Sequence, residues 1–481
     1  MAPVSKPVKL PGFCHSLCTF LCILSIISIG LFFLSTSLHS LMLGCIIVSA
    51  VSACVLGYSY QEVRDAMNEG IRGALPAIYI FIMIGVMIAS LVESGTLATM
   101  IFYGIQLIEP VIFLPASLVF CSLMSIATGS SWGTVGTAGV VLMGIGSAMG
   151  FPPPVVAGVI VSGACFGDKM SPVSDTTNLA AMSAGTTLYG HIRSMCFTTL
   201  PVYCLVLVIF AWVGLNNASH HFSASDLNTL TQGLHDTFTI SWLTVMPLVI
   251  MLLLSGLRVP AEVAMMAASL SAVVLAVTLQ NRELGSVLTS LFHGSDMRSG
   301  VVILDKLLAR GGIASMMWTL SLALMALALG GILSHFGFLR VLVAGLLNRV
   351  RRGAALIPVT ILTCFIGNIS MGEAYMSIIL GGQLFGEAYD NLGVERSILS
   401  RSLEEGSTLT MALIPWTTGG AFFASALDVS VLDYAPWALL NWLNPVLSIV
   451  GGYLGFILFR NNIQPVLSQA GVSENPSQHV I

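Results

Sequence analysis

Apolar segments of about twenty residues follow one another along almost the whole chain. A transmembrane helix needs about 20 apolar residues to cross a hydrocarbon core of roughly 30 Å. Because these segments are continuous rather than alternating, they predict helices, which satisfy their own backbone hydrogen bonds in lipid. The chain is therefore predicted to be an all-α polytopic membrane protein with about 10 to 14 crossings. The clearest predicted spans are residues 17–34, 41–57, 74–92, 111–127, 195–215, 241–256, 261–279, 313–333, 354–369 and 435–458.

Composition agrees with a membrane protein and argues against several classes of function. The chain has 481 residues, of which 56% are hydrophobic and 8% charged, whereas about a quarter of the residues in soluble domains are charged. A net charge of -4 is too small, on a chain mostly inside lipid, to indicate a nucleic-acid partner. The sequence contains no phosphate-binding loop and no nucleophile with a matching base, so neither an ATP-driven pump nor an enzyme is indicated. No cofactor is predicted, and membrane lipid is the expected surrounding.

Basic residues indicate how the chain is oriented. Arg349, Arg351 and Arg352 form a dense cluster in a short loop, whereas residues 216–240 contain no Lys or Arg. Because cytoplasmic loops carry an excess of Lys and Arg, the cluster is predicted to be cytoplasmic and the loop without them external. Both chain termini are then cytoplasmic. Residues 280–312 are a partial exception, because several basic residues in that loop would face out.

Two parts of the chain resemble each other in the order and spacing of their motifs. Arg72 before one span corresponds to Arg310, and Gly129 after a later span corresponds to Gly367, since 310 minus 72 and 367 minus 129 both give 238. A register shared by several elements indicates an internal repeat. With the predicted orientation, the first unit starts inside and the second outside, so the repeat is inverted, as in many secondary transporters. The predicted segments are N-terminal transmembrane helices in 1–60, repeat one in 61–215, an external loop with linking helices in 216–298, repeat two in 299–459 and a cytoplasmic tail in 460–481.

Two apolar regions rich in Gly, Ser and Thr, 128–190 and 367–428, lie between the spans. They are predicted to contain interrupted helices or re-entrant hairpins, which in inverted-repeat transporters meet near the midplane and form the binding site. In the first region, Gly129 lets the backbone leave the helix, and hydroxyl side chains add neutral oxygens of the kind that hold sodium. Close helix packing through small residues is the alternative. The candidate ligands are Ser130, Ser131 and Thr134.

The stretch from Phe166 to Ala181 places charged residues between two apolar runs. Charges at that depth are rare unless they are paired or functional. Pro172 disfavours helix at the residue before it, so the chain is predicted to unwind between Asp168 and Thr177. Two acids and one base leave a net negative site, suited to a cation or to exchangeable protons, and an aqueous surface loop is the alternative. The candidates are Asp168, Lys169, Ser171, Ser174, Asp175, Thr176, Thr177 and Asn178.

The second repeat supplies a corresponding set of polar residues. Glu373 lies in an otherwise apolar segment, where a buried carboxylate could exchange a proton for a cation. Glu404 and Glu405 follow Asp168 at nearly the repeat spacing, so the acidic tip is predicted to recur in the second repeat. Arg401 could pair with Glu404 if the segment is helical. The candidates in this half are Asn368, Ser370, Glu373, Glu404, Glu405, Ser407 and Thr408.

Two runs, GDKMSPVSDTTNLA at 167–180 and LSRSLEEGSTLTMALIPWTTGGAFFASAL at 399–427, resemble the NhaC-type sodium/proton antiporter family. The general layout covers roughly residues 61–459. The resemblance implies a secondary antiporter of the inner membrane that exchanges sodium for protons or transports a sodium-coupled organic acid, as malate/lactate members do. Relatives often have an Asp near Gly372-Glu373 and Glu-Asp in place of Glu404-Glu405. The resemblance assigns Asp168, Ser171, Ser174, Asp175, Thr176 and Thr177 to one half-site, and Glu404, Glu405, Ser407, Thr408, Pro415 and Trp416 to the other.

The predicted function is secondary active antiport by alternating access, in which a shared acidic site of Asp168, Asp175 and Glu373 binds either sodium or protons. One alternative is sodium- or proton-coupled exchange of a small carboxylate or an amino acid, with Lys169 contacting an organic anion. The other alternative is a passive cation channel. The sequence leaves the solute, the stoichiometry and the oligomeric state open, a homodimer included.

A few other ionisable residues receive bland interpretations. Glu262 follows Pro260 closely and is interpreted as an acid at a helix N-terminus. His191, His293 and His335 flank predicted spans without partners at metal-ligand spacing, and are interpreted as solvated loop histidines.

Overall fold

The computed structural model describes residues 10–455, apart from 73–74, 218–223, 258, 298, 300, 302–303, 306–307, 310, 348–349 and 351. Across these residues the regular elements are helices, and each predicted span coincides with one of them. The all-α fold class is therefore confirmed. The predicted tail 460–481 and three of the basic residues used for orientation, Arg310, Arg349 and Arg351, lie outside the described residues.

The first half of the chain contains α1 to α12. Their bounds are α1 (Phe13–Phe32), α2 (Leu38–Val55), α3 (Tyr60–Arg72), α4 (Leu75–Glu93), α5 (Thr96–Leu107), α6 (Pro110–Thr128), α7 (Ser131–Thr134), α8 (Val140–Ala148), α9 (Pro153–Met170), α10 (Asp175–Ala184), α11 (Leu188–Asn217) and α12 (Ala224–Thr237). A π-helical turn, η1 (Val135–Gly139), joins α7 to α8. The predicted external loop 216–240 thus contains a helix, α12, because Leu230 and Leu234 recur at helical spacing and are buried.

The second half follows the same order of elements. It contains a 3-10 turn, η2 (Trp242–Val245), and then α13 (Met246–Gly256), α14 (Ala261–Thr278), α15 (Leu284–His293), α17 (Ile313–His335), α18 (Phe338–Leu347), α19 (Gly353–Met371), α20 (Ala374–Asn391), α21 (Arg396–Gly406), α22 (Thr408–Met411), α23 (Thr418–Leu427), α24 (Val431–Tyr434) and α25 (Leu439–Leu454).

Equivalent helices of the two halves have equal lengths and the same special backbone positions. Both α6 and α19 have 19 residues with one internal proline, and both end at a left-handed glycine, Gly129 with φ 69° and Gly372 with φ 68°. Both α10 and α23 have 10 residues and follow a hydroxyl cap, Ser174 or Thr417. The two caps are as far apart in the chain as the two glycines, since 417 minus 174 and 372 minus 129 both give 243. This shared separation, the Gly129–Gly372 spacing, sets the register of the repeats around the turns.

The predicted partner of Gly129 is therefore wrong. Gly367 lies inside α19, and the residue equivalent to Gly129 is Gly372. The predicted spacing does hold at the starts of α4 and α17, Leu75 and Ile313, since 313 minus 75 is 238. It then grows because α17 has 23 residues and α4 has 19, which moves every later element of the second repeat along the chain.

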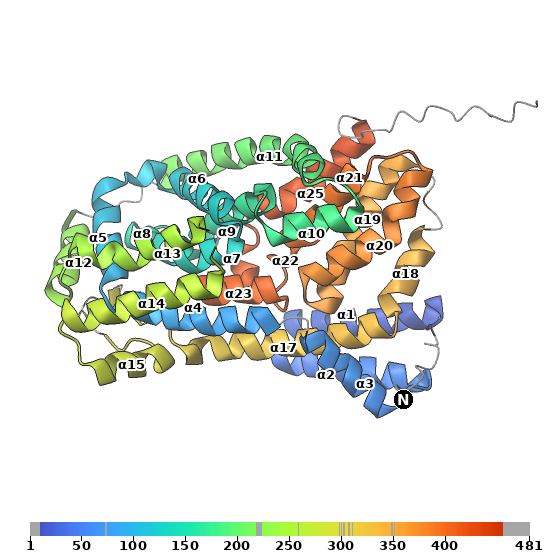
Figure 1. Ribbon diagram of the computed structural model, residues 1–481, viewed down its shortest axis with the longest axis horizontal. Coiled ribbons are helices and arrows are strands. Elements are labelled where there is room, and N and C mark those ends of the chain that lie inside the picture. The colour runs from blue at the N-terminus through green and yellow to red at the C-terminus, as the bar shows by residue number, and fades with distance from the viewer. Residues whose placement is uncertain are drawn as a thin grey trace, which may run out of the picture.

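The repeats are inverted and packed against each other. In Figure 1, α4 leads toward α5 at the left, whereas α17 leads toward α18 at the right. These two helices are in contact, so they run in opposite directions side by side. Short helices cross between the halves, since α10 packs on α20 and α23 packs on α7, η1 and α8. Each repeat thus completes the other around a central interface.

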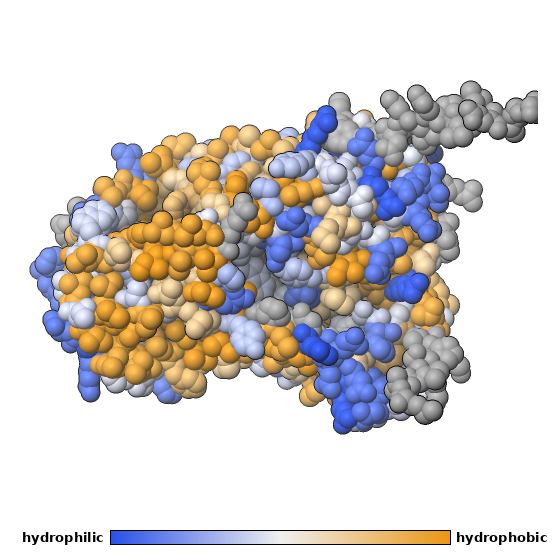
Figure 2. Space-filling model, viewed as in Figure 1, coloured by the Kyte–Doolittle hydropathy of each residue, from blue (hydrophilic) through white to orange (hydrophobic). Residues whose placement is uncertain are grey.

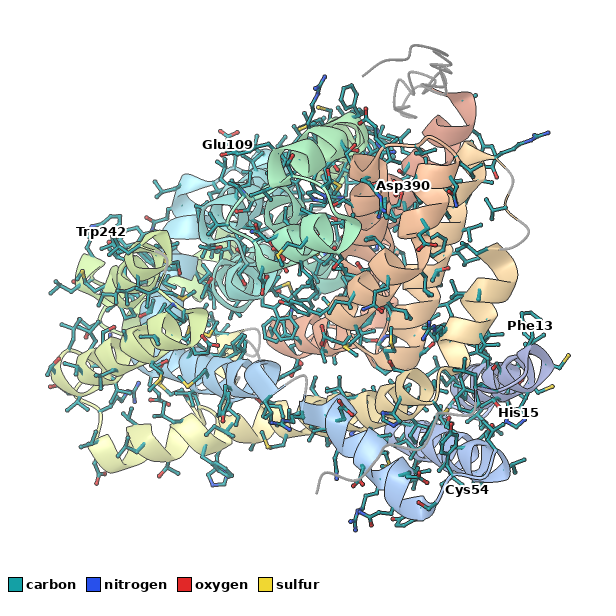
Figure 3. All side chains as sticks on the ribbon, turned by 45° about the vertical axis from the view of Figure 1, so that its right-hand side comes forward. Phe13, His15, Cys54, Glu109, Trp242 and Asp390 are labelled. Carbon is teal, nitrogen blue, oxygen red and sulfur yellow. The ribbon has the colours of Figure 1, made fainter. Side chains whose placement is uncertain are left out.

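Flanking helices extend this pseudo-symmetry. The pair α1 and α2 packs together, and α2 lies on α17, while the pair α13 and α14 packs together, and α14 lies on α4. The two pairs occupy opposite ends of the molecule, as Phe13 and Cys54 show relative to Trp242 in Figure 3. Figure 2 shows an apolar surface over α13 and α14, to which the exposed side chains of Leu253 and Leu270 belong.

Six described helices are long and apolar enough to cross a membrane: Phe13–Leu31, Leu38–Val55, Pro110–Thr128, Leu188–Asn216, Ile313–His335 and Gly353–Met371. Counting two bent pairs as single spans raises the number to 8. This is fewer than the predicted crossings, because several apolar helices are shorter than a bilayer requires. Among these are Leu439–Leu454 and Thr418–Leu427.

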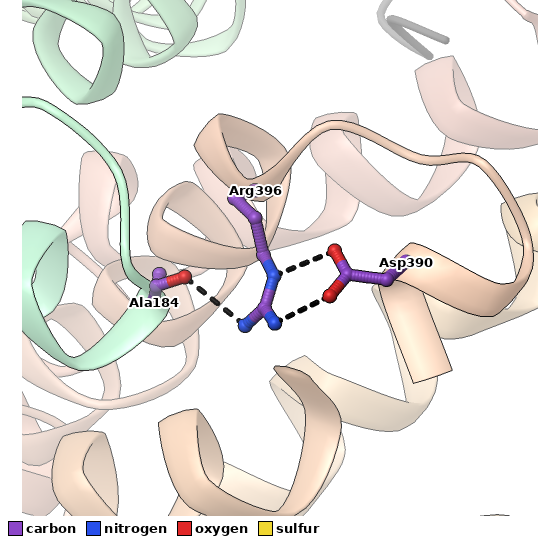
Figure 4. A network of polar contacts seen from close by, with 3 residues as sticks. All are labelled: Ala184, Asp390 and Arg396. Carbon is purple, nitrogen blue, oxygen red and sulfur yellow. Dashed lines mark hydrogen bonds and ion pairs between the residues drawn. The ribbon is translucent and has the colours of Figure 1, made fainter. Parts of the chain in front are cut away.

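One surface contact joins the end of α10 to the second repeat. Arg396, at the start of α21, donates two hydrogen bonds to the Asp390 carboxylate at 2.8 and 2.7 Å and one to the Ala184 carbonyl at 3.2 Å (Figure 4). The hydrogen bonds from Arg396 lower the pKa of the exposed Asp390 carboxyl. Ala184 is the last residue of α10, so this contact fixes the far end of a helix whose start lies in the molecular centre.

Candidate functional site

In the first repeat, a hairpin turn meets a break in a helix. The turn is Gly129–Ser130, between α6 and α7, and the break is residues 171–174, between α9 and α10. A Cβ atom on Gly129 would lie 3.0 Å from the backbone of Ser174 and Val173, so only glycine lets the turn approach this closely.

The unwound segment is shorter than predicted. We expected unwinding from Asp168 to Thr177, but α9 continues to Met170 and α10 starts at Asp175. The Ser174 side chain accepts a hydrogen bond from the Thr177 backbone, which caps α10 and restores the helix directly after the break.

Asp168 is the polar centre of this half-site. Its Oδ2 accepts hydrogen bonds from the Ser131 hydroxyl at 2.6 Å and the Ser131 backbone at 3.2 Å. Its Oδ1 accepts one from the Ser174 hydroxyl at 2.6 Å. The carboxylate therefore joins the hairpin turn to the broken helix, and its charge is stabilised by three donors.

Asp175 connects the first repeat to the second. Its Oδ1 accepts a hydrogen bond from the Thr176 backbone at 2.9 Å, and its Oδ2 accepts one from the Tyr375 hydroxyl of α20. Tyr375 was not among the predicted site residues, because a tyrosine near an apolar helix start carries no specific sequence signal. The correct register could have identified it, since Ser130–Trp132 and Glu373–Tyr375 are equivalent at the Gly129–Gly372 spacing.

The second half-site has the same backbone arrangement with different side chains. Glu373 follows Gly372 at the hairpin turn, and its Oε1 accepts a hydrogen bond from the Ala374 backbone at 3.0 Å. Its Oε2 accepts one from the Thr418 hydroxyl at 2.5 Å, while the Thr418 backbone donates to the Gly372 carbonyl at 2.9 Å. Thr418 was also missed, although it is equivalent to Asp175 and starts α23 as Asp175 starts α10.

A cavity of about 660 Å³ lies between the two half-sites. Nine of the predicted residues line it: Ser130, Ser131, Asp168, Lys169, Asp175, Thr176, Glu373, Glu404 and Thr408. Glu262, interpreted as a helix acid, does lie in the first turn of α14 and also lines the cavity. The cavity thus brings together polar residues from both repeats and from α14.

Other predicted residues hold the breaks in shape rather than line the cavity. Ser171 donates to the Ile126 carbonyl at 2.7 Å, Thr177 to the Asp168 carbonyl at 3.2 Å and Asn178 to the Ser174 carbonyl at 2.6 Å. Ser174 also lies outside the cavity lining and acts through Asp168 and the helix cap. These bonds satisfy backbone carbonyls that the broken helix leaves without helical partners.

The remaining non-lining candidates make contacts within or between helices. Their donations run from Thr134 to the Ser130 carbonyl, from Asn368 to the Ser407 carbonyl, from Ser370 to the Ile366 carbonyl, from Ser407 to the Leu403 carbonyl and from Trp416 to the Ile369 carbonyl. Pro415, assigned by the family resemblance, is equivalent to Pro172 and lies in the second break. The structure therefore gives these residues a role in packing the hairpins.

Glu404 and Glu405 are not the structural counterpart of Asp168. At the Gly129–Gly372 spacing, the residue equivalent to Asp168 is Met411, whereas both glutamates lie inside α21. Glu404 lines the cavity and accepts from Thr408 at 2.8 Å. Glu405 lies outside the lining and accepts from Thr198 at 2.7 Å and Asn444 at 2.9 Å.

Two buried bases accompany these acids. Lys169 is 1% exposed, and its Nζ has no hydrogen-bond partner among the described residues, while Glu404 and Glu405 act on it electrostatically. Arg401 donates to the Ser194 hydroxyl at 3.3 Å. His191 is buried with its Nδ1 2.5 Å from the Ser400 hydroxyl, so its interpretation as a solvated loop residue is wrong.

Asp168, Asp175 and Glu373 line one cavity but belong to separate hydrogen-bond groups. Within the described part of the chain, no three His, Cys, Asp or Glu residues are arranged to hold a metal ion. A sodium ion in the cavity would therefore be bound by one carboxylate together with hydroxyl and carbonyl oxygens, the neutral ligands that hard cations accept.

Comparison with known proteins agrees with this geometry. The model of the Na+/H+ antiporter family matches residues 14–165 and 163–456. The chain belongs to this family. It is 37% identical over 433 residues to the Na+/H+ antiporter NhaC of Alkalihalophilus pseudofirmus, covering 90% of this chain and 93% of that protein. The sequence resemblance is thereby confirmed.

Other relatives of similar extent have different names. The chain is 35% identical to the malate-2H+/Na+-lactate antiporter of Bacillus subtilis, over 85% of this chain and 87% of that protein. It is 32% identical to the arginine/ornithine antiporter ArcD of Halobacterium salinarum, over 95% of each. These relatives are antiporters, so this chain belongs to a family of multi-pass membrane transporters and not to an enzyme family.

Proposed function

We propose that this antiporter exchanges sodium for protons by alternating access, with the cavity between the half-sites as the shared binding site. The observation that carries the proposal is the pair of hairpin turns, Gly129–Ser130 and Gly372–Glu373, each set against a broken helix of its own repeat. Corresponding broken elements of inverted repeats form the sites of many secondary transporters.

The carboxylates that line the cavity provide the coupling. When sodium binds beside Asp168, the ion and the Ser130 and Ser131 oxygens can replace a proton on the carboxylate. When sodium leaves, a proton neutralises the same carboxylate, because an unpaired charge at that depth is unfavourable. Sodium and protons therefore compete for one site, and each transport step carries one of them.

The transporter is proposed to lie in the inner membrane, surrounded by lipid, with both termini in the cytoplasm. The support is the apolar outer surface of α13 and α14 and the distribution of basic residues. Assembly as a homodimer stays a prediction from the sequence.

The decisive experiment reconstitutes the full chain in vesicles that contain a pH-sensitive dye. Addition of sodium should move protons outward across the membrane, and labelled sodium inside should accelerate uptake of external sodium. Asp168→Asn and Asp175→Asn should abolish sodium-dependent proton movement while the protein remains folded. Normal exchange in both variants would remove this site from the mechanism, and sodium current without trans-acceleration would indicate a channel.

A second candidate function is exchange of a small organic solute coupled to sodium or protons. The volume of the cavity, about 660 Å³, favours it, because it lies in the range of small-molecule sites and exceeds the space a bare ion needs. Some relatives exchange organic solutes according to their names, malate and lactate in one case and arginine and ornithine in another. Uptake of labelled solutes by the same vesicles tests this candidate.

A further inference from the structure

The cavity has two chemically different walls. One wall is polar and formed by the hairpin turns and broken helices described above. The other is apolar and is formed by Ile80, Val173, Met251, Val259, Met376 and Ile379. Sodium is held by oxygen atoms alone, so an apolar wall adds nothing to its binding. A ligand with both a charged end and a hydrocarbon part would contact both walls.

The charged residues of the lining are mostly acidic. Asp168, Asp175, Glu262, Glu373 and Glu404 face the cavity with one base, Lys169. A dicarboxylate would add two negative charges to five acids, which Coulomb repulsion disfavours inside a protein. A ligand with two cationic groups and one anionic group matches the acids and the single base.

Two buried side chains in the lining indicate where those groups would bind. Glu404 is 0% exposed and its Oε2 has no hydrogen-bond partner among the described residues, and the same holds for the ammonium of Lys169 at 1% exposure. A buried polar atom without a partner costs about 1 to 3 kcal/mol, and more if it is charged. A ligand carboxylate at Lys169 and a ligand ammonium at Glu404 would supply both missing partners.

An aromatic ring completes the polar wall. Trp132 lines the cavity, and Phe422 stacks against its indole with ring centres 4.6 Å apart and planes 9° from parallel. Phe81 packs edge-on against both rings. A tryptophan held in this way is well suited to contact an ammonium or guanidinium group, since cation–π attraction is strongest for indole.

We propose that the organic solute carried in this cavity is a basic α-amino acid, whose carboxylate pairs with Lys169, whose cationic groups bind Glu404 and the acids of the hairpin turns, and whose aliphatic chain lies on the apolar wall. This inference rests on the proposed function in so far as the cavity is the transport site. It names the solute class for that site and selects against dicarboxylates.

The test measures uptake of labelled arginine by vesicles that contain the full chain, with unlabelled competitors. Ornithine should compete as arginine does, whereas agmatine and putrescine, which lack the carboxylate, should compete about ten-fold less because Lys169 remains unpaired. Malate and lactate should not compete. Preferential uptake of malate or lactate overturns the proposal, as does failure of every cationic compound to compete. Equal competition by arginine and agmatine overturns the role of Lys169.

Variants then assign the contacts. Lys169→Met should reduce the preference for arginine over agmatine to about two-fold or less, and Glu404→Gln should weaken both ligands together. Because the preference is a ratio measured on one preparation, loss of folded protein cancels from it. Glu387→Gln, an exposed carboxylate of α20, is the matched control and should leave the preference unchanged. An unchanged preference in Lys169→Met contradicts the assignment.

The same vesicles separate the two proposals. If sodium moves protons but no basic amino acid competes or is taken up, the solute class is wrong and the sodium–proton function stands. If arginine is taken up and exchanged while sodium moves no protons, the solute class stands and the sodium–proton function is wrong.

Discussion

The two hairpin turns share a backbone but differ in where they carry the acid. In the first repeat, the turn residue is Ser130 and the acid, Asp175, starts the helix after the break. In the second repeat, the turn residue is the acid, Glu373, and the hydroxyl residue Thr418 starts the helix after the break. At equivalent positions, acid and hydroxyl have therefore changed places.

This exchange makes two unlike half-sites from one arrangement. Asp168 adds a second acid to the first half-site, whereas its equivalent in the second is the apolar Met411. The first half-site therefore has carboxylates on the broken helix and hydroxyls on the turn. The second has its carboxylate on the turn, held by one hydroxyl. The first suits a cation bound by several oxygens, and the second suits one exchangeable proton.

Glu373→Gln should produce the largest change that distinguishes the two halves. Loss of the carboxylate at the second turn should shift the pH profile of sodium-dependent proton flux and lower the flux about ten-fold at the original optimum, since one pH unit corresponds to a ten-fold change in occupancy. Flux measured from about pH 5 to 9 tests this. Ser130→Gln, at the equivalent position, should change the flux without moving the profile. A profile unaltered in Glu373→Gln removes Glu373 from the proton role.

The two turn glycines should differ in their tolerance of a methyl group. Both have positive φ, which costs a non-glycine residue about 1 to 2 kcal/mol. The new Cβ would meet backbone atoms of the break at Gly129, but the side chain of Ala326 at Gly372, each at 3.0 Å. Gly129→Ala should therefore reduce flux about ten-fold and Gly372→Ala about three-fold, because a side chain yields more readily than backbone. Equal losses in both would show that only the shared φ matters.

The predictions from the sequence succeeded where they rested on composition. Continuous apolar runs identified the helices, and the motif around Asp168 identified most residues of the first half-site. The choice of Gly367 failed because a glycine among apolar residues can stay helical, and the sequence does not show that α17 is longer than α4. Side-chain partners such as Thr418 depend on packing between repeats, which no local pattern encodes. Pro172 and Pro415, which share the Gly129–Gly372 spacing, were the available signal for the correct register.

Thr418→Val should affect transport more than Ser131→Ala. Thr418 is the side-chain donor to Glu373 Oε2, so its loss leaves a buried acceptor unpaired at about 1 to 3 kcal/mol. Asp168 keeps the Ser131 backbone and the Ser174 hydroxyl as donors when the Ser131 hydroxyl is removed. The apparent affinity for sodium and the pH profile, measured for both variants, check this order. A stronger effect of Ser131→Ala would show that its hydroxyl binds the ion directly.

Asp390→Asn should have the smallest effect, because it lies on the surface far from the turns. The hydrogen bonds from Arg396 lower the pKa of Asp390 below its ordinary value of about 3.9, so the charged form is favoured in the folded protein. The stabilisation is therefore present above about pH 4 and is lost as the pH falls through the lowered pKa. An exposed pair contributes about 1 kcal/mol or less. Thermal unfolding of the detergent-solubilised protein should show Asp390→Asn slightly less stable than wild type at pH 7, with the difference vanishing near pH 3. A difference that persists at pH 3 would mean that the aspartate acts through packing rather than charge, and the sodium-dependent flux of this variant should equal that of the wild type.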